Sequence, residues 1–590
     1  MQATDNSPLH WLRHYASPEY HWKSTSHSGT TRWSRPIGLV ESIFDSDGRY
    51  WEGRADISNL QELEIRSSLG REQLRERILL AWTCLRNQHL LLQAKAALNP
   101  KSQPNDTDSD RLQFTVDVEE SPETAIAEAR RHIVFLQDYY DAIDWQDFWR
   151  HCQNTKRVIY PDSALATIFV LPLEPRPNGH QTLRFLSIGA HQIWDGLTTS
   201  VWMQDLIHNL NCTTSQLQIR LAQALEPSGV ATRLPMPQEA LYPPITGSRA
   251  KRHWFWLLTR ILRHVRKPLQ AGFSNPLYRP QGARQPVALS PTYEKAGLDY
   301  TAIPPFNTVL CTLAFPAHQT RTLHRLCREA GASIGAGCFA LVALTMMEMQ
   351  EQLEPDIALA DRKPFISGFP LNPRAFFDYR VDPDSCMLAF SDGIALPFLS
   401  KTLPFQGRLR LAARQAHRQL AAFTKRSGVA KADGDVQFML SRGAGRVLQT
   451  QYVNSVERSD AMLPQELRSG VEPQGAYPPR PNGSNQTCGV SSVGRNPWLK
   501  RGMYDLHIPA QSIGDGGGGE GEFVADFRRS YSCVRAREGE FLVGIGGSDE
   551  GLWANISIDA STVDLELVGV WREKILRVLE DKEVVVAAKL

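Results

Sequence analysis

The chain has 590 residues, enough to bury large cores and to form two or three domains. Its 42% hydrophobic and 22% charged residues are ordinary for a globular enzyme, and a formal net charge of +2 gives no overall attraction to nucleic acid. The nine cysteines form no CxxC pair and no metal-like cluster, so we expect free thiols and no metal. Residues 1–14 lack the apolar core of a signal peptide, and no apolar run approaches the ~20 residues that span a bilayer.

Hydrophobic periodicity and turn residues predict several elements in the first part of the chain. Leu74, Ile78, Trp82 and Leu85 recur at three- and four-residue steps, which is typical of one face of a helix. The turn Pro177-Asn178-Gly179 joins the last two predicted strands into an antiparallel hairpin. In chain order the predicted elements are a helix at 71–98, a polar loop at 99–111, a strand at 112–118, a helix at 122–136, and strands at 165–173 and 183–188.

The hairpin leads into Gly189-Ala190-His191-Gln192-Ile193-Trp194-Asp195-Gly196, which contains the pattern HxxxDG, and a helix is predicted at 197–210. A neutral imidazole at a strand end can accept a proton from a hydroxyl or an amine, because its ordinary pKa is near ~6.5. Asp195 either reaches this imidazole or secures the loop through a cation or the helix N-terminus. The alternative is a structural loop histidine followed by an N-cap aspartate.

Residues 226–305 are proline-rich and are interpreted as a crossover. Within them, residues 251–267 carry six formal positive charges, no acid and interleaved tryptophans. Such a stretch is typical of a basic amphipathic helix that lies on an anionic membrane surface. It is also compatible with a crossover helix whose apolar face packs on the protein while its arginines are solvated, and we favour this second interpretation.

The rest of the chain alternates again between strand and helix patterns. Ser333 precedes an apolar helical run and is a predicted N-cap. The glycine-rich segment Gly514–Gly521 lacks GK[ST] and carries acid, so it predicts a flexible hairpin tip and no phosphate loop. The predicted elements are a strand at 308–315, helices at 319–330 and 333–350, a strand at 365–371 followed by Asn372-Pro373-Arg374, a strand at 553–558 and a helix at 563–579.

The HxxxDG pattern of residues 191–196 resembles the active-site motif of the superfamily that contains chloramphenicol acetyltransferase and the condensation domains of peptide synthetases. Condensation domains usually carry two adjacent histidines, and Ala190 stands in the first of these positions. The chain is therefore more similar to free-standing acyltransferases, in particular to the fungal group resembling trichothecene 15-O-acetyltransferase. The resemblance covers roughly residues 32–580, but only the motif is specific.

The resemblance implies roles for individual residues. His191 would be the general base, and Asp195 and Gly196 would be structural, with Asp195 paired to a distant arginine that we assign to Arg374. The plant relatives carry DFGWG where this chain has Ser491 and Ser492, a departure shared with the fungal group. Each serine either contacts the substrate or the reaction's oxyanion, or is an ordinary strand-edge residue.

The fold that the resemblance implies is α/β, with two chloramphenicol-acetyltransferase-like lobes of mixed sheets and flanking helices around a central tunnel. We assign residues 1–225 to the N-terminal lobe, 226–305 to a crossover linker and 306–590 to the C-terminal lobe. The implied activity moves an acyl group, acetyl being the simplest, from acyl-CoA as co-substrate to a hydroxyl or amine of a secondary metabolite. No bound cofactor and no metal are implied, and we expect a monomer.

Two other functions remain open at this stage. One is a condensation-like enzyme that takes its acyl group from a carrier protein in polyketide or peptide biosynthesis, and the other is a non-catalytic acyltransferase-like binding protein. For the location in the cell, Ala588-Lys589-Leu590 resembles the Ser-Lys-Leu peroxisomal address, so we expect a peroxisomal protein, or else a cytoplasmic one.

Overall fold

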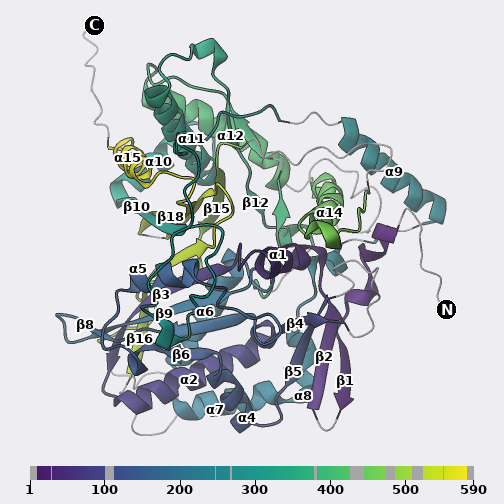
Figure 1. The fold of residues 1–590 in the computed structure, drawn as a ribbon, viewed down its shortest axis with the longest axis vertical. Helices are drawn as coiled ribbons and strands as arrows, with labels where there is room; N and C mark the ends of the chain where they lie inside the picture. Colours follow the sequence, from purple (N-terminus) through teal and green to yellow (C-terminus); the bar gives the residue numbers. More distant parts are fainter. Residues whose placement is uncertain are drawn as a thin grey trace.

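The computed structural model describes residues 10–27, 30–99, 112–242, 244–245, 247–265, 269–377, 382–391, 393–424, 444–473, 486–507, 523–548 and 550–580. Three predictions fall outside these residues: most of the polar loop at 99–111, the glycine-rich Gly514–Gly521, and the C-terminal Ala588-Lys589-Leu590. The architecture is mixed α/β, with several sheets flanked by helices, and this confirms the predicted class (Figure 1).

The largest sheet carries the motif. Its central strand β9 is antiparallel to β3 on one side and to β7 on the other, with Gly189 opposite both Ile57 and Ala166. In Figure 1 the helices α2, α4 and α7 lie below this sheet. In order across the sheet the strands are β16 (Phe523–Val534), β3 (Ile57–Ser67), β9 (Gln181–Gly189), β7 (Ala166–Val170) and β6 (Ile133–Phe135), with β8 (Glu174–Pro175) beside β9.

Helices α2, α4, α6 and α8 form one continuous core with the large sheet, whereas α5 and α7 contribute to two smaller clusters beside it. Trp82, Phe185 and Trp202 are almost fully buried in this core and come from a helix, a strand and a second helix. The helices are α2 (Arg71–Gln88), α4 (Pro122–Arg130), α5 (Trp145–Asn154), α6 (Gly196–Leu210), α7 (Thr214–Leu225) and α8 (Pro227–Val230).

A second sheet lies in the upper part of Figure 1, among later helices of the chain. Its strands, in order, are β10 (Thr308–Ala314), β18 (Gly551–Asp559), β17 (Phe541–Ser548) and β15 (Gly489–Arg495). Helix α11 is the centre of the adjoining core, since its residues from Ala336 to Met347 are all buried. The neighbouring helices are α10 (Ala317–Glu329), α11 (Ile334–Leu353), α12 (Phe405–Thr424) and α15 (Leu565–Arg577).

Smaller elements complete the described fold. The strand β2 leads directly into α1, whose buried face borders the site described below. A third sheet has the order β1 (Lys23–His27), β2 (Thr30–Pro36), β5 (Leu112–Val118) and β4 (Lys95–Leu98). The remaining elements are α1 (Leu39–Tyr50), α9 (Arg249–Val265), α14 (Ala444–Ala461), and the strand pairs β11 (Phe365–Ser367) with β14 (Ile394–Leu396) and β12 (Pro370–Leu371) with β13 (Ala389–Phe390).

Two predicted helices were too long. The helix predicted at 71–98 ends at Gln88, and residues 95–98 form β4 against β5. The helix predicted at 122–136 ends at Arg130, and residues 133–135 form β6 against β7. In both cases pairing with a distant strand overrides the local helical pattern.

The predicted N-cap is confirmed, because Ser333 Oγ accepts a hydrogen bond of 3.3 Å from the N–H of Ala336.

The chain crosses between the sheets near its end. Strand β16 pairs along its length with β3, so a segment from the predicted C-terminal lobe belongs to the sheet that carries the motif. The boundaries at 225 and 305 stay a prediction.

Within the described residues no single helix is long and apolar enough to cross a bilayer, although α10 and α11, bent by 106°, meet the criteria of length and composition as a pair.

Candidate active site

His191 lies two residues after the end of β9, in the loop that leads to α6. The loop is tightly folded, because Ala190 donates a backbone hydrogen bond of 2.8 Å to Leu165 and the ring of Trp194 packs over Gly189. A Cβ at position 189 would lie only 2.2 Å from that ring, so a glycine is required there. The central strand and the buried tryptophan therefore hold the backbone of His191 rigidly, while part of its side chain stays accessible.

One ring nitrogen of His191 is occupied by the backbone. Its Nδ1 lies 3.1 Å from the carbonyl oxygen of Ala55, and the ring stacks on Phe44 with centroids 3.9 Å apart. A carbonyl can only accept, so Nδ1 carries the proton in this contact. In the neutral imidazole Nε2 is then the acceptor, and it makes no hydrogen bond to the residues that the structure describes.

The carbonyl of Ala55 is aimed by a strained turn. Ala55 has φ of 69° and Glu52 has φ of 49°, in the left-handed region that residues with a Cβ seldom occupy. Backbone hydrogen bonds of 2.9 Å in both directions join residues 55–56 to Arg535, and Asp56 accepts two bonds of 2.8 Å from Arg157. Strain of about 1–3 kcal/mol per residue persists only where the surroundings impose it, and it clusters at functional sites.

The electrostatic surroundings keep His191 neutral. Its burial, and then the guanidinium of Arg537, lower the imidazole pKa to about 4, against smaller opposing effects of Asp195, the Ala55 carbonyl and Asp47. Arg537 is held close by an ion pair of 2.8 Å with the fully buried Asp47. The unprotonated imidazole is the form that accepts a proton, so this environment favours a general base.

This shift predicts the acidic limit of activity. Because His191 must be unprotonated to act and its folded-state pKa is depressed, it stays competent as the pH falls through 6.5 and becomes protonated only near pH 4. We therefore expect kcat/KM to fall on the acidic side with an apparent pKa near 4. The measurement is a pH profile of kcat/KM in which circular dichroism at each pH checks that the protein is folded. An acidic limb at the ordinary histidine value would show that the free enzyme's base is less shielded than this geometry requires.

Asp195 caps helix α6 and pairs with Arg374. One carboxylate oxygen accepts bonds of 3.0 Å from the N–H groups of Leu197 and Thr198, and the other lies 2.7 Å from Nη2 of Arg374 and 3.2 Å from the N–H of Met387. Both side chains of the ion pair are nearly fully buried. Burial raises the pKa of Asp195, but Arg374 and the surrounding donors outweigh it, so the pKa lies below its ordinary value. The sequence allowed Asp195 either to reach the imidazole or to secure the loop through a cation or the helix N-terminus. In the structure it contacts the cation Arg374 and the N-terminus of α6.

The remaining predicted residues lie on β15 and at the start of α6. Gly196 is exposed. A Cβ at this position would first meet Cγ1 of Val493, at 3.9 Å. Ser491 and Ser492 directly precede Val493, and Asn496 donates a bond of 3.0 Å to Ser200 of α6. Strand β15 therefore touches the first turn of α6. No hydrogen bond joins either serine to His191 within the described part of the chain.

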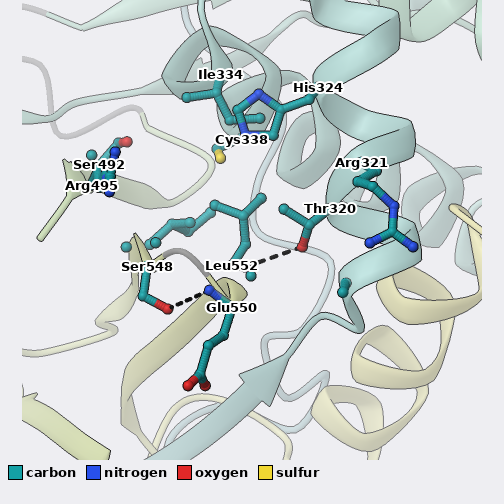
Figure 2. Close-up of a pocket in the computed structure, with 16 residues that line it drawn as sticks. Thr320, Arg321, His324, Ile334, Cys338, Ser492, Arg495, Ser548, Glu550 and Leu552 are labelled. Atoms are coloured by element: carbon teal, nitrogen blue, oxygen red, sulfur yellow. Dashed lines mark hydrogen bonds between the residues drawn. The ribbon is translucent and has the colours of Figure 1, made fainter. Parts of the chain in front are cut away.

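Ser492 faces a separate cavity of about 410 Å³ (Figure 2). Figure 2 shows His324 and Arg321 on α10 at one side of it and Ser492 with Arg495 on β15 at the other. The hairpin of β17 and β18 closes it below, where the hydroxyl of Thr320 accepts a bond of 3.1 Å from Leu552. His191 is not among the residues that line this cavity.

Arg458 on α14 is a cation connected to the histidine through two aromatic rings. Its guanidinium lies 4.2 Å above the ring of Phe390, which packs at 6.2 Å against Phe44, the ring stacked on His191. Within the described residues Arg458 forms no ion pair and no side-chain hydrogen bond, and its buried Nε is unsatisfied. Burial, and then Arg537, lower its pKa to about 10. An arginine in this setting is suited to bind an anionic group.

Sequence reasoning missed four contributors to this site: Phe44, Asp47, Ala55 and Arg537. They come from α1, from the turn before β3 and from the segment after β16, and no local pattern marks them. The nearest sequence signal for the turn at Ala55 was Gly53 beside acidic residues, which does not distinguish a strained turn from an ordinary one.

Among the described residues, no group of three or more histidine, cysteine or acidic side chains is arranged to hold a metal.

Comparisons with known proteins bear on the fold. No protein-family model and no curated protein sequence matches the chain. Among solved structures, trichothecene 15-O-acetyltransferase from Fusarium sporotrichioides superimposes with a TM-score of 0.60 at 13% identity, covering 95% of this chain and 97% of that one. The starter condensation domain of rhizomide synthetase in complex with C8-CoA gives 0.50 at 10% identity, covering 93% and 95%. The chain thus has the fold of acetyltransferases and condensation domains.

Proposed function

We propose that the protein is an acyltransferase that moves an acyl group, acetyl being the simplest, from acyl-CoA to a hydroxyl or amine of a secondary metabolite. The observation that carries this proposal is the imidazole of His191, which is neutral, held through Nδ1 by the Ala55 carbonyl and open at Nε2. A base that is fixed in tautomer and orientation is what proton abstraction from a weakly acidic hydroxyl needs.

In the proposed reaction Nε2 of His191 takes the proton of the acceptor hydroxyl as its oxygen attacks the thioester carbonyl. The tetrahedral intermediate then collapses, the carbon–sulfur bond breaks and the thiolate leaves. His191 returns the proton to that thiolate, so the enzyme ends unchanged. The reaction requires no covalent enzyme intermediate, and Asp195, paired with Arg374, keeps the loop in place without taking a proton.

In spatial terms we propose two lobes that face one another across a tunnel, with His191 midway along it. The acceptor and the thioester would enter from opposite mouths. The cavity beside Ser492 is our candidate for part of the donor site, because Arg321 and His324 provide cationic and hydrogen-bonding groups suited to phosphate oxygens. Ser491 or Ser492 would contact the substrate or the oxyanion from β15.

Two rivals remain. A condensation-like enzyme would use the same histidine with a carrier-bound thioester, and the similar structure of a starter condensation domain supports that possibility. A non-catalytic binding protein would keep the fold without turnover. The similar structures also support CoA, since one is an acetyltransferase and another was solved with C8-CoA.

The experiment that separates these functions uses the purified protein with labelled acetyl-CoA and an extract of small metabolites, analysed by untargeted mass spectrometry. Acetylated products that form from free acetyl-CoA support the proposal. Products that form only when the acyl group is supplied on a carrier protein favour the condensation-like enzyme. No product from either donor, with a folded protein, supports the binding protein and contradicts the proposal.

Arg458 leads to a prediction about the acceptor. Because Arg458 forms no ion pair with any residue that the structure describes, and its guanidinium lies over the ring of Phe390, we expect the acceptor to carry an anionic group that pairs with it. Hydrogen bonds to charged groups contribute about 1.5–3 kcal/mol, so Arg458→Gln should raise KM for the acceptor by roughly 10- to 100-fold and leave KM for acyl-CoA nearly unchanged. Arg458→Lys should keep part of the affinity.

The matched control is Arg418→Gln, on the exposed side of α12, which should leave both KM values unchanged. The products themselves give a second measurement, since they should be retained on an anion exchanger at neutral pH. Neutral products together with an unchanged KM in Arg458→Gln would refute the anionic acceptor. They would leave the acyl transfer itself established.

A further inference from the structure

Helix α9 is fixed to the protein along one face. Phe255, Trp256, Thr259 and Arg263 are buried there, at positions that share one side of the helix. The ring of Trp256 meets that of Trp11 edge to face, with centroids 5.3 Å apart. Arg263 forms two contacts of 2.5 Å with the carboxylate of Glu457 on α14. This anchoring fixes the direction in which every other side chain of α9 points.

A second side of α9, next to the buried one around the helix, is apolar and exposed. Trp254 is 63% exposed, Leu262 45% and Val265 62%. With the partly exposed Leu258 they recur at steps of four, four and three residues, so they form a single stripe along the helix. Soluble proteins seldom leave a row of large apolar side chains in water without a binding role.

The charges on this helix are all of one sign. Arg249, Lys251 and Arg252 are exposed in its first turn, Arg260 and Arg263 lie further along, and the helix contains no aspartate or glutamate. A stripe of tryptophan and aliphatic side chains with exposed basic residues at its N-terminal end matches the boundary between lipid head groups and acyl chains, where negative phosphates lie above the hydrocarbon. Figure 1 shows α9 at the outer edge of the molecule.

We propose that the outer face of α9 docks the protein onto an anionic membrane surface. Trp254, Leu258, Leu262 and Val265 insert at the head-group boundary, while Arg249, Lys251 and Arg252 contact lipid phosphates. The helix lies in the plane of the membrane and does not cross it. The structure agrees with the preferred interpretation of the sequence, since one apolar face of α9 packs on the protein and its first-turn basic residues are exposed. It adds a second apolar stripe, which is exposed.

The test is co-sedimentation of the full chain with vesicles of phosphatidylcholine mixed with phosphatidylserine, compared with vesicles of phosphatidylcholine alone. We expect binding to the mixed vesicles that weakens as salt is added, because salt screens the attraction to the phosphates. Trp254→Ser combined with Leu262→Ser should reduce binding at least tenfold, since each removes an apolar anchor. Both side chains are exposed, so the variant should melt like the wild type.

The matched control is Ile219→Ser on α7, which replaces an apolar side chain of similar exposure, 58%, outside the stripe. It should bind as the wild type does. Wild-type protein that ignores both kinds of vesicle overturns the proposal, and so does equal loss of binding in the control. Self-association of the wild type that the double variant abolishes, without vesicle binding, would show that a second copy covers this face and would also overturn it. None of these outcomes depends on catalysis.

Discussion

Replacing His191 with alanine should reduce acyl transfer by ~10²–10⁴-fold, the usual cost of losing a general base. The loss should appear in kcat, because the imidazole acts on the acceptor proton during the reaction. The fold should survive, since the side chain contributes one hydrogen bond to Ala55 and one stacking contact with Phe44. The measurements are initial rates with acetyl-CoA and the identified acceptor, together with a thermal melt.

His318→Ala is the control for this variant, because His318 is exposed on α10 and belongs to no part of the site. It should retain full activity. Near-normal turnover by folded His191→Ala would eliminate the proposed mechanism. The site would then have to be sought elsewhere, beginning with the cavity that His324 lines.

Replacing Asp195 with alanine should lower the stability of the protein as well as its activity. The substitution leaves Arg374 buried without its carboxylate, and breaking a buried pair from one side costs about 3–5 kcal/mol. It also removes the N-cap of α6, worth about 1 kcal/mol. We expect a lower melting temperature, lower solubility and reduced acyl transfer, measured by thermal unfolding and by activity at a temperature where the variant is still folded.

Asp195→Asn separates the two contributions, because asparagine can still cap the helix but lacks the charge that Arg374 requires. Arg374→Gln and the double variant complete a cycle that isolates the interaction energy of the pair. The control is Glu573→Ala, which breaks the exposed contact of 3.3 Å with Arg577 on α15 and should change the stability little. If Asp195→Ala melts with the wild type, the pair contributes no stability and the structural role assigned to Asp195 is wrong.

The sequence alone predicted the element that carries the motif, because all the signals are local. Apolar runs, the turn at Gly179 and a candidate N-cap at Asp195 predict a hairpin, a loop and a helix between residues 165 and 210, and the structure has β7, β9 and α6 there. The contact of Asp195 with Arg374 was expected only through the family resemblance, since the two residues are 179 positions apart. No periodicity reports a contact over that distance.

What the tertiary structure decided is the chemistry of the histidine and the accessibility of α9. The partner of Nδ1 is a backbone carbonyl 136 residues away, held by a strained turn, and Arg537 comes from near the other end of the chain. Side-chain types cannot predict such contacts, because a carbonyl is the same in every residue and its direction depends on the backbone. For α9, the sequence shows that the helix is basic and amphipathic, whereas only packing against Trp11 and α14 decides which apolar face is buried and which one remains exposed to solvent.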